Sequence, residues 1–185
     1  MLPIGPLMIE HRQIERMIKT MRIRLDEIQT RGKADSALIG QFVHFIRTYA
    51  DRCHHGKEED ILFRELAKKK MRPEHKRILK ELIEEHRFSR KVTSALAEAN
   101  RRYQKGETDS LSAIIKNLGT LLEFYPGHIK KEDKAFFLPV MGYFSQEEKE
   151  AMIREGYELD SRLLHREYES WDQPGDATAL TPERE

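Results

Sequence analysis

The stretch His55-Gly-Lys-Glu-Glu-Asp-Ile-Leu-Phe63 has a close relative later in the same chain, His128-Ile-Lys-Lys-Glu-Asp-Lys-Ala-Phe136. Both stretches read His-x-Lys-x-Glu-Asp-x-x-Phe, so each carries a histidine followed four residues later by a glutamate. Residues four apart in an α-helix lie above one another on one face, and such a His and Glu can reach the same point. The repeat therefore predicts two related helices, each presenting a polar pair on one face.

A second and weaker repeat precedes each of these stretches. Glu10-His11-Arg12 matches Glu85-His86-Arg87, and both histidines fall on apolar stripes where a leucine would be expected. The chain is thus predicted to contain two copies of a helical hairpin, each supplying one lone histidine and one His-x-x-x-Glu pair.

Apolar residues spaced alternately three and four apart predict four helices that pack against one another. The stripes run from Leu7 to Ile28, Leu38 to Leu66, Leu79 to Leu96 and Leu111 to Phe136. A fifth amphipathic segment follows at 146–171. The predicted fold class is all-α, an up-down-up-down four-helix bundle with an additional C-terminal helix.

The same pattern suggests how the chain is divided. We expect the bundle to occupy residues 1–144, an accessory helix residues 145–171, and a disordered tail rich in Pro, Gly, Thr and Asp residues 172–185. The accessory helix is expected to pack outside the bundle or to form a homodimer contact.

Composition narrows the class of function. Lys and Arg number 33 and Asp and Glu number 32 in 185 residues, so no net field favours nucleic acid or anionic lipid. No apolar run is long enough to span a bilayer, and the N-terminus lacks the pattern of a secretory signal. The only cysteine, Cys53, excludes an internal disulfide. We expect a cytoplasmic protein that binds neither membrane nor nucleic acid.

Buried imidazoles and carboxylates are expensive unless something neutralises and satisfies them. A pair of metal ions would do both, and nitrogen and oxygen donors suit iron, manganese or zinc. The sequence predicts six ligands, which could give each ion two histidines and let both glutamates bridge: His11, His55, Glu59, His86, His128 and Glu132.

His54 and Glu58 form an alternative pair at the same spacing. Alignment with the second stretch favours His55 and Glu59, because only that register matches Phe63 with Phe136. His54 is then expected near the ligands or at the surface. The competing interpretation of both stretches is a solvated helix face that happens to repeat.

These motifs resemble the hemerythrin-like, or HHE cation-binding, family over roughly Leu7 to Phe144. The resemblance implies a four-helix bundle around a di-iron centre with an oxo or hydroxo bridge, held by the six residues above. The third helix differs from that of the oxygen carriers, which offer two histidines four apart, because residue 82 is Leu and residue 90 is Arg. The pattern looks more like bacterial members linked to iron–sulfur repair, nitric oxide or peroxide.

Two functions remain open from sequence. In the first, the centre binds or reacts with a small ligand such as dioxygen, nitric oxide or peroxide, for sensing or detoxification. In the second, the protein stores or donates iron, or acts as an iron-responsive interaction module. The sequence does not decide whether the protein is an enzyme.

Overall fold

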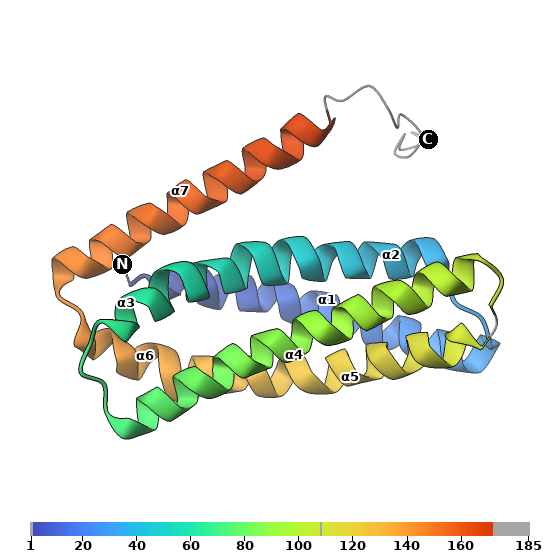
Figure 1. Cartoon of the computed structure of the whole chain (residues 1–185), viewed down its shortest axis with the longest axis horizontal. Coiled ribbons are helices and arrows are strands. Elements are labelled where there is room, and N and C mark those ends of the chain that lie inside the picture. Colours follow the sequence, from blue (N-terminus) through green and yellow to red (C-terminus); the bar gives the residue numbers. More distant parts are fainter. Residues whose placement is uncertain (1, 108, 172–185) are drawn as a thin grey trace.

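The computed structural model describes residues 2–107 and 109–171, with side chains as far as residue 163. Four long helical segments run alternately up and down and form a bundle, as Figure 1 shows. No strand occurs among the described residues, so the predicted all-α four-helix bundle with an additional C-terminal helix is confirmed. The first and third segments are α1 (Ile4–Arg31) and α4 (Pro73–Gln104).

The second and fourth segments change helix type along their length. The second comprises α2 (Ser36–Phe45), η1 (Ile46–His55), η2 (Glu58–Phe63) and α3 (Arg64–Ala67). The fourth comprises α5 (Ser110–Lys131), η3 (Glu132–Phe136), α6 (Phe137–Val140) and the short η4 (Met141–Tyr143). The segments η1, η2 and η3 are π-helical, a form that occurs mostly as short stretches at functional sites.

The turn between α1 and α2 follows from local chemistry. Gly32 adopts a left-handed conformation with φ of 66° and donates its N–H to the carbonyl of Ile28, which ends α1. The carboxylate of Asp35 then accepts hydrogen bonds from the N–H groups of Ala37 and Leu38, which begins α2. The chain therefore reverses within a few residues and sets the two helices side by side.

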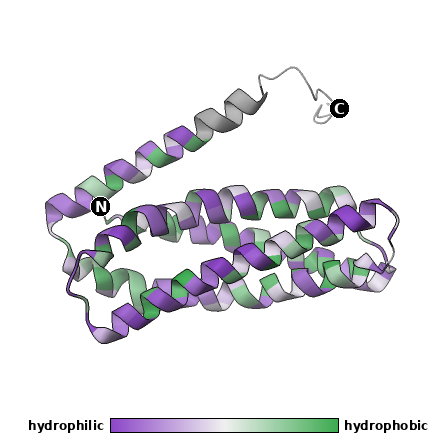
Figure 2. Ribbon diagram, viewed as in Figure 1, coloured by the Kyte–Doolittle hydropathy of each residue, from purple (hydrophilic) through white to green (hydrophobic). Residues whose placement is uncertain are grey.

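The bundle has two apolar cores with a polar layer between them. The larger core includes Ile18, Leu96 and Leu118, and the smaller includes Leu66 and Phe136 at the other end of the bundle. Along each segment polar and apolar residues alternate, as the colours of Figure 2 show. Histidines and glutamates interrupt each apolar stripe at the same level, which creates the polar layer.

Pro126 lies inside α5 and cannot donate a hydrogen bond to the carbonyl of Leu122 one turn earlier. The guanidinium of Arg22 on α1 donates to that carbonyl at 3.2 Å instead. This side chain replaces the missing backbone hydrogen bond, so α5 continues past the proline to His128.

The last helix, α7 (Gln146–Trp171), lies outside the bundle and diverges from it toward the C-terminus, as Figure 1 shows. Its first half packs on the second segment, where Met152 is buried and Glu155 forms a two-point ion pair with Arg64 at 2.7 Å. The tail predicted at 172–185 lies outside the described residues. Within the described parts of the chain, no helix combines the length and apolarity needed to cross a membrane.

Truncating a core leucine should destabilise the bundle more than any surface change of equal size. Leu118 is completely buried, and Leu118→Ala should lower the free energy of unfolding by about 2–5 kcal/mol because it leaves a cavity. Leu138→Ala is the matched control, since Leu138 is 64% exposed and should cost no more than about 0.5 kcal/mol. Urea unfolding at equal metal content measures both, and equal losses would contradict the assigned core.

Candidate metal centre

Seven ionisable side chains meet in the polar layer between the two apolar cores. Each of the seven is at most 3% exposed, and every segment of the bundle contributes at least one: His11, His54, His55, Glu58, His86, His128 and Glu132. A cluster of this size without a counter-charge would be strongly destabilising.

Each imidazole uses its Nδ1 atom to bind a carboxylate at the edge of the cluster. His11 binds Asp133 at 2.8 Å, His54 binds Glu10 at 2.9 Å, and His55 binds Asp51 at 3.3 Å. In the same way, His86 binds Glu59 at 2.6 Å and His128 binds Glu85 at 2.8 Å. A carboxylate that accepts from Nδ1 fixes the ring orientation and leaves the Nε2 lone pair available.

The atoms on the inner side of the cluster have no hydrogen-bond partner. They comprise the Nε2 atoms of all five histidines and both carboxylate oxygens of Glu58 and Glu132, all buried. Buried polar atoms are normally satisfied, so nine unsatisfied atoms facing one another require an explanation. Neutral imidazole nitrogens and carboxylate oxygens are the donors that iron, manganese and zinc accept in proteins.

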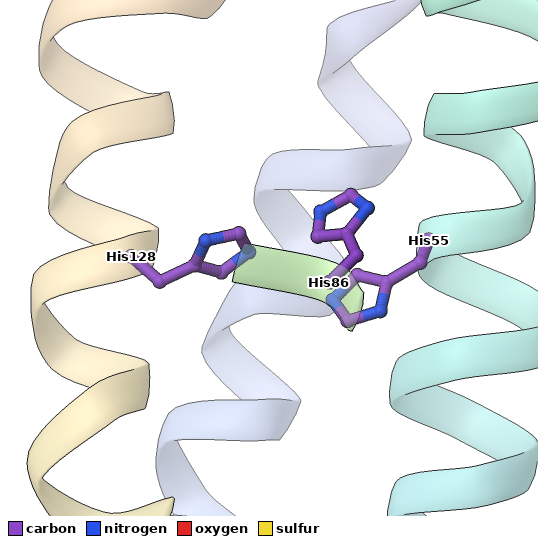
Figure 3. A group of neighbouring side chains, drawn as sticks. All are labelled: His55, His86 and His128. Carbon is purple, nitrogen blue, oxygen red and sulfur yellow. The ribbon is translucent and has the colours of Figure 1, made fainter. Parts of the chain in front are cut away.

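The donors form two neighbouring groups. One contains His55, His86 and His128, and Figure 3 shows these three imidazoles converging from three segments of the bundle. The other contains two histidines and two carboxylates: His11, His54, Glu58 and Glu132. Within each group the donor atoms lie within 4.8 Å of one another, a separation that one cation could span.

The two glutamates lie between the groups and face both. Glu58 places Oε1 3.5 Å from Nε2 of His54 and Oε2 3.3 Å from Nε2 of His86. Glu132 places Oε2 3.1 Å from Nε2 of His11 and Oε1 3.4 Å from Nε2 of His128. Each carboxylate therefore places one oxygen beside each group of histidines.

The electrostatics of the cluster favour bound positive charge. Burial alone would lower the pKa of His11 and of His86, but Glu132 and the other carboxylates raise them to about 9 and about 11 respectively. Burial and the neighbouring histidines hold the pKa of His55 well below its ordinary value. Protons are thus attracted to the imidazoles nearest the buried carboxylates, and a metal cation would be attracted for the same reason.

The structure brings together five of the six residues expected from the sequence and places Glu59 elsewhere. Glu59 is partly exposed, and its Oε1 accepts from Nδ1 of His86 and from Arg90 at 2.8 Å. Glu58 takes the inner position instead. Glu59, which the sequence predicts as a ligand, therefore lies outside the buried cluster and contacts the outer side of the His86 ring.

The internal repeat explains this placement of Glu59, because its spatial register differs by one residue from the sequence alignment. Phe63 stacks on His86 and Phe137 stacks on His11, so Phe63 corresponds to Phe137 rather than to Phe136. By the same symmetry His54 corresponds to His128. The structural repeat is His54-x-x-Lys-Glu-Glu59 and His128-x-x-Lys-Glu-Asp133.

In this register His55 corresponds to Ile129, so the first copy places one more histidine in the cluster than the second. His54 lies 18 residues after the start of α2 and His128 lies 18 residues after the start of α5, so the two histidines occupy matching places in their segments. His54 and His55 are consecutive and both buried in the cluster, and they lie at the end of the π-helix η1, whose turns are wider than those of an α-helix. α-Helical spacing alone does not predict that two consecutive residues both face the interior.

Fold and donor set together define the class: a four-helix bundle with a buried His and Glu cluster that could bind cations. The chain belongs to the hemerythrin HHE cation-binding domain family, whose family model matches residues 2–138. A search of curated proteins gave no match.

Proposed function

We propose that the protein is a non-haem di-iron protein of the hemerythrin type. The cations would be held by seven residues: His11, His54, His55, Glu58, His86, His128 and Glu132. The observation that supports this most strongly is that the two ring nitrogens of each imidazole differ: Nδ1 is hydrogen-bonded to a carboxylate, whereas Nε2 faces the centre without a hydrogen-bond partner. A histidine that ligates a metal through one ring nitrogen typically donates its other ring N–H to a carboxylate in this way.

The two cations would have unequal ligand sets. The group with His55, His86 and His128 offers three imidazoles, and one oxygen of Glu58 and one of Glu132 lie beside it, which would give five protein donors. The group with His11 and His54 offers two imidazoles and two oxygens. The cation on the His11 and His54 side therefore keeps more positions for an external ligand.

We further propose that a small ligand such as dioxygen, nitric oxide or peroxide binds at this centre for sensing or detoxification. Bound iron would supply the redox chemistry, while the chain supplies orientation and a dry apolar surround. Phe137 stacks on His11 at a ring distance of 5.6 Å, and apolar cores close the layer at both ends. Such a surround limits access to small molecules.

Metal analysis combined with optical spectroscopy tests the proposal. Protein loaded with Fe²⁺ without air should hold two irons per chain, and its spectrum should change on adding dioxygen, nitric oxide or peroxide. The His128→Ala variant should hold fewer irons and lose most of the change, because the three-histidine group loses a ligand. Loaded protein that responds to none of these molecules would favour iron storage or donation instead.

A further inference from the structure

The two copies of the repeat support their histidines with the same chain of charges. In the second copy, Glu85 on α4 binds Nδ1 of His128 and also accepts from the ammonium of Lys131. Lys131 donates in addition to Glu81 at 3.2 Å, one helical turn before Glu85 on the same helix. Two carboxylates therefore hold the lysine, and the lysine helps to hold Glu85 in place.

In the first copy, the bundle itself does not supply the carboxylate that corresponds to Glu81. Glu10 binds Nδ1 of His54 and accepts from Lys57, as Glu85 does with His128 and Lys131. The residue one turn before Glu10, which corresponds to Glu81, is Pro6. Proline cannot supply the second carboxylate.

Helix α7 supplies it from outside the bundle. Asp160 accepts a hydrogen bond from Lys57 at 2.6 Å, and it also accepts from the thiol of Cys53 at 3.3 Å. The side chain of Lys57 is only 6% exposed, so its ammonium depends on Glu10 and Asp160 for compensation. Although burial alone would raise the pKa of Glu10, the hydrogen bonds from His54 and Lys57 hold it below its ordinary value.

We propose that Asp160 on α7 is a positioning residue for the metal centre, acting through Lys57 and Glu10 on His54. Without its carboxylate, Lys57 draws Glu10 away from His54, and the imidazole loses the partner that fixes its ring. Docking of α7 and cation binding on the His11 and His54 side are then thermodynamically coupled, and each favours the other. The inference rests on the proposed metal centre.

Two α7 variants test this inference in the full-length chain. Asp160→Asn removes the carboxylate that holds Lys57, whereas Glu155→Gln removes an ion pair that ties α7 to Arg64 away from the centre. Asp160 and Glu155 are matched, since their side chains are 34% and 37% exposed. Both variants weaken docking of α7, but only Asp160→Asn changes the series of contacts that runs through Lys57 and Glu10 to His54.

Titration with Fe²⁺ under anaerobic chelator competition gives the affinity of each cation. Asp160→Asn should lower the affinity for the more weakly bound of the two cations about tenfold, at the lower end of the effect of such supporting groups. Glu155→Gln should leave both affinities within about twofold, as expected for an exposed ion pair. Equal affinities in the two variants would overturn the inference.

Hydrogen exchange measures the reciprocal effect without any activity assay. Loading with Fe²⁺ should slow exchange of the amides at 152–163 in the unaltered protein and in Glu155→Gln, but not in Asp160→Asn. Identical protection in all three proteins would overturn the coupling. If the unaltered protein binds no cation, the proposed function itself fails, and the two failures are thereby distinguished.

Discussion

The Glu58→Gln variant should retain at most one cation per chain, where the unaltered protein retains two. Each carboxylate oxygen of Glu58 lies near a different histidine group, so both cations lose part of their ligand set when the charge is removed. The remaining amide can offer a single neutral oxygen and cannot compensate two cations. Metal content after desalting, measured by atomic emission, gives the result.

Glu59→Gln is the matched control, because the same change is made one residue further along the chain. Glu59 holds His86 from behind, and its loss should weaken binding about tenfold while leaving two cations at saturating metal. The sequence alignment on its own predicts the opposite order. If Glu59→Gln abolished binding and Glu58→Gln did not, the bridging role given to Glu58 would be wrong.

Removal of metal should lower the thermal stability by a large margin. With free metal about 100-fold above the dissociation constant, each cation adds about 2.7 kcal/mol of stability by mass action. For a domain of this size each kcal/mol shifts the melting temperature by about 2–4 °C, so two cations should contribute roughly 10–20 °C. Differential scanning calorimetry before and after chelation measures the difference.

The expected loss of thermal stability on metal removal follows from the nine unsatisfied atoms in the polar layer. Without cations, the carboxylates of Glu58 and Glu132 remain buried and are compensated only by protons on nearby imidazoles. The Glu58→Gln variant should show a smaller loss on chelation than the unaltered protein, because it has less bound metal to lose. An unchanged melting temperature after complete chelation would mean that the cluster does not bind cations in the folded state.

Much of the fold could be predicted from spacing alone. A four-and-three alternation of apolar residues requires helices that bury one face, and four such stretches with short links close into a bundle. His11 and His86 could be singled out because each interrupts an apolar stripe, where an unsatisfied polar group is costly, and His128 because its stretch repeats an earlier one. These inferences depend on local geometry, which the order of residues determines.

The choice between Glu58 and Glu59 could not be predicted in that way. The aligned register matches more identical residues, yet the π-helices η1 and η2 rotate the chain so that His54 and Glu58 face inward. A π-helix is rare and differs from an α-helix in its spacing, so α-helical periodicity does not predict where one occurs. The sequence of this stretch does not reveal the π-helix. It does show that His54 and Glu58 have the same four-residue spacing as His55 and Glu59, which left the choice between the two pairs open.

The sequence by itself determined the helical bundle, the repeat and the kind of donor, because helical periodicity and the cost of burying charge are local rules. Only the tertiary structure decided that Glu58 rather than Glu59 enters the buried cluster, that His54 lies in it, and that Asp160 on α7 contacts Lys57. Those outcomes depend on contacts between residues far apart in the chain, and side chains on four separate segments settle the register of each turn together.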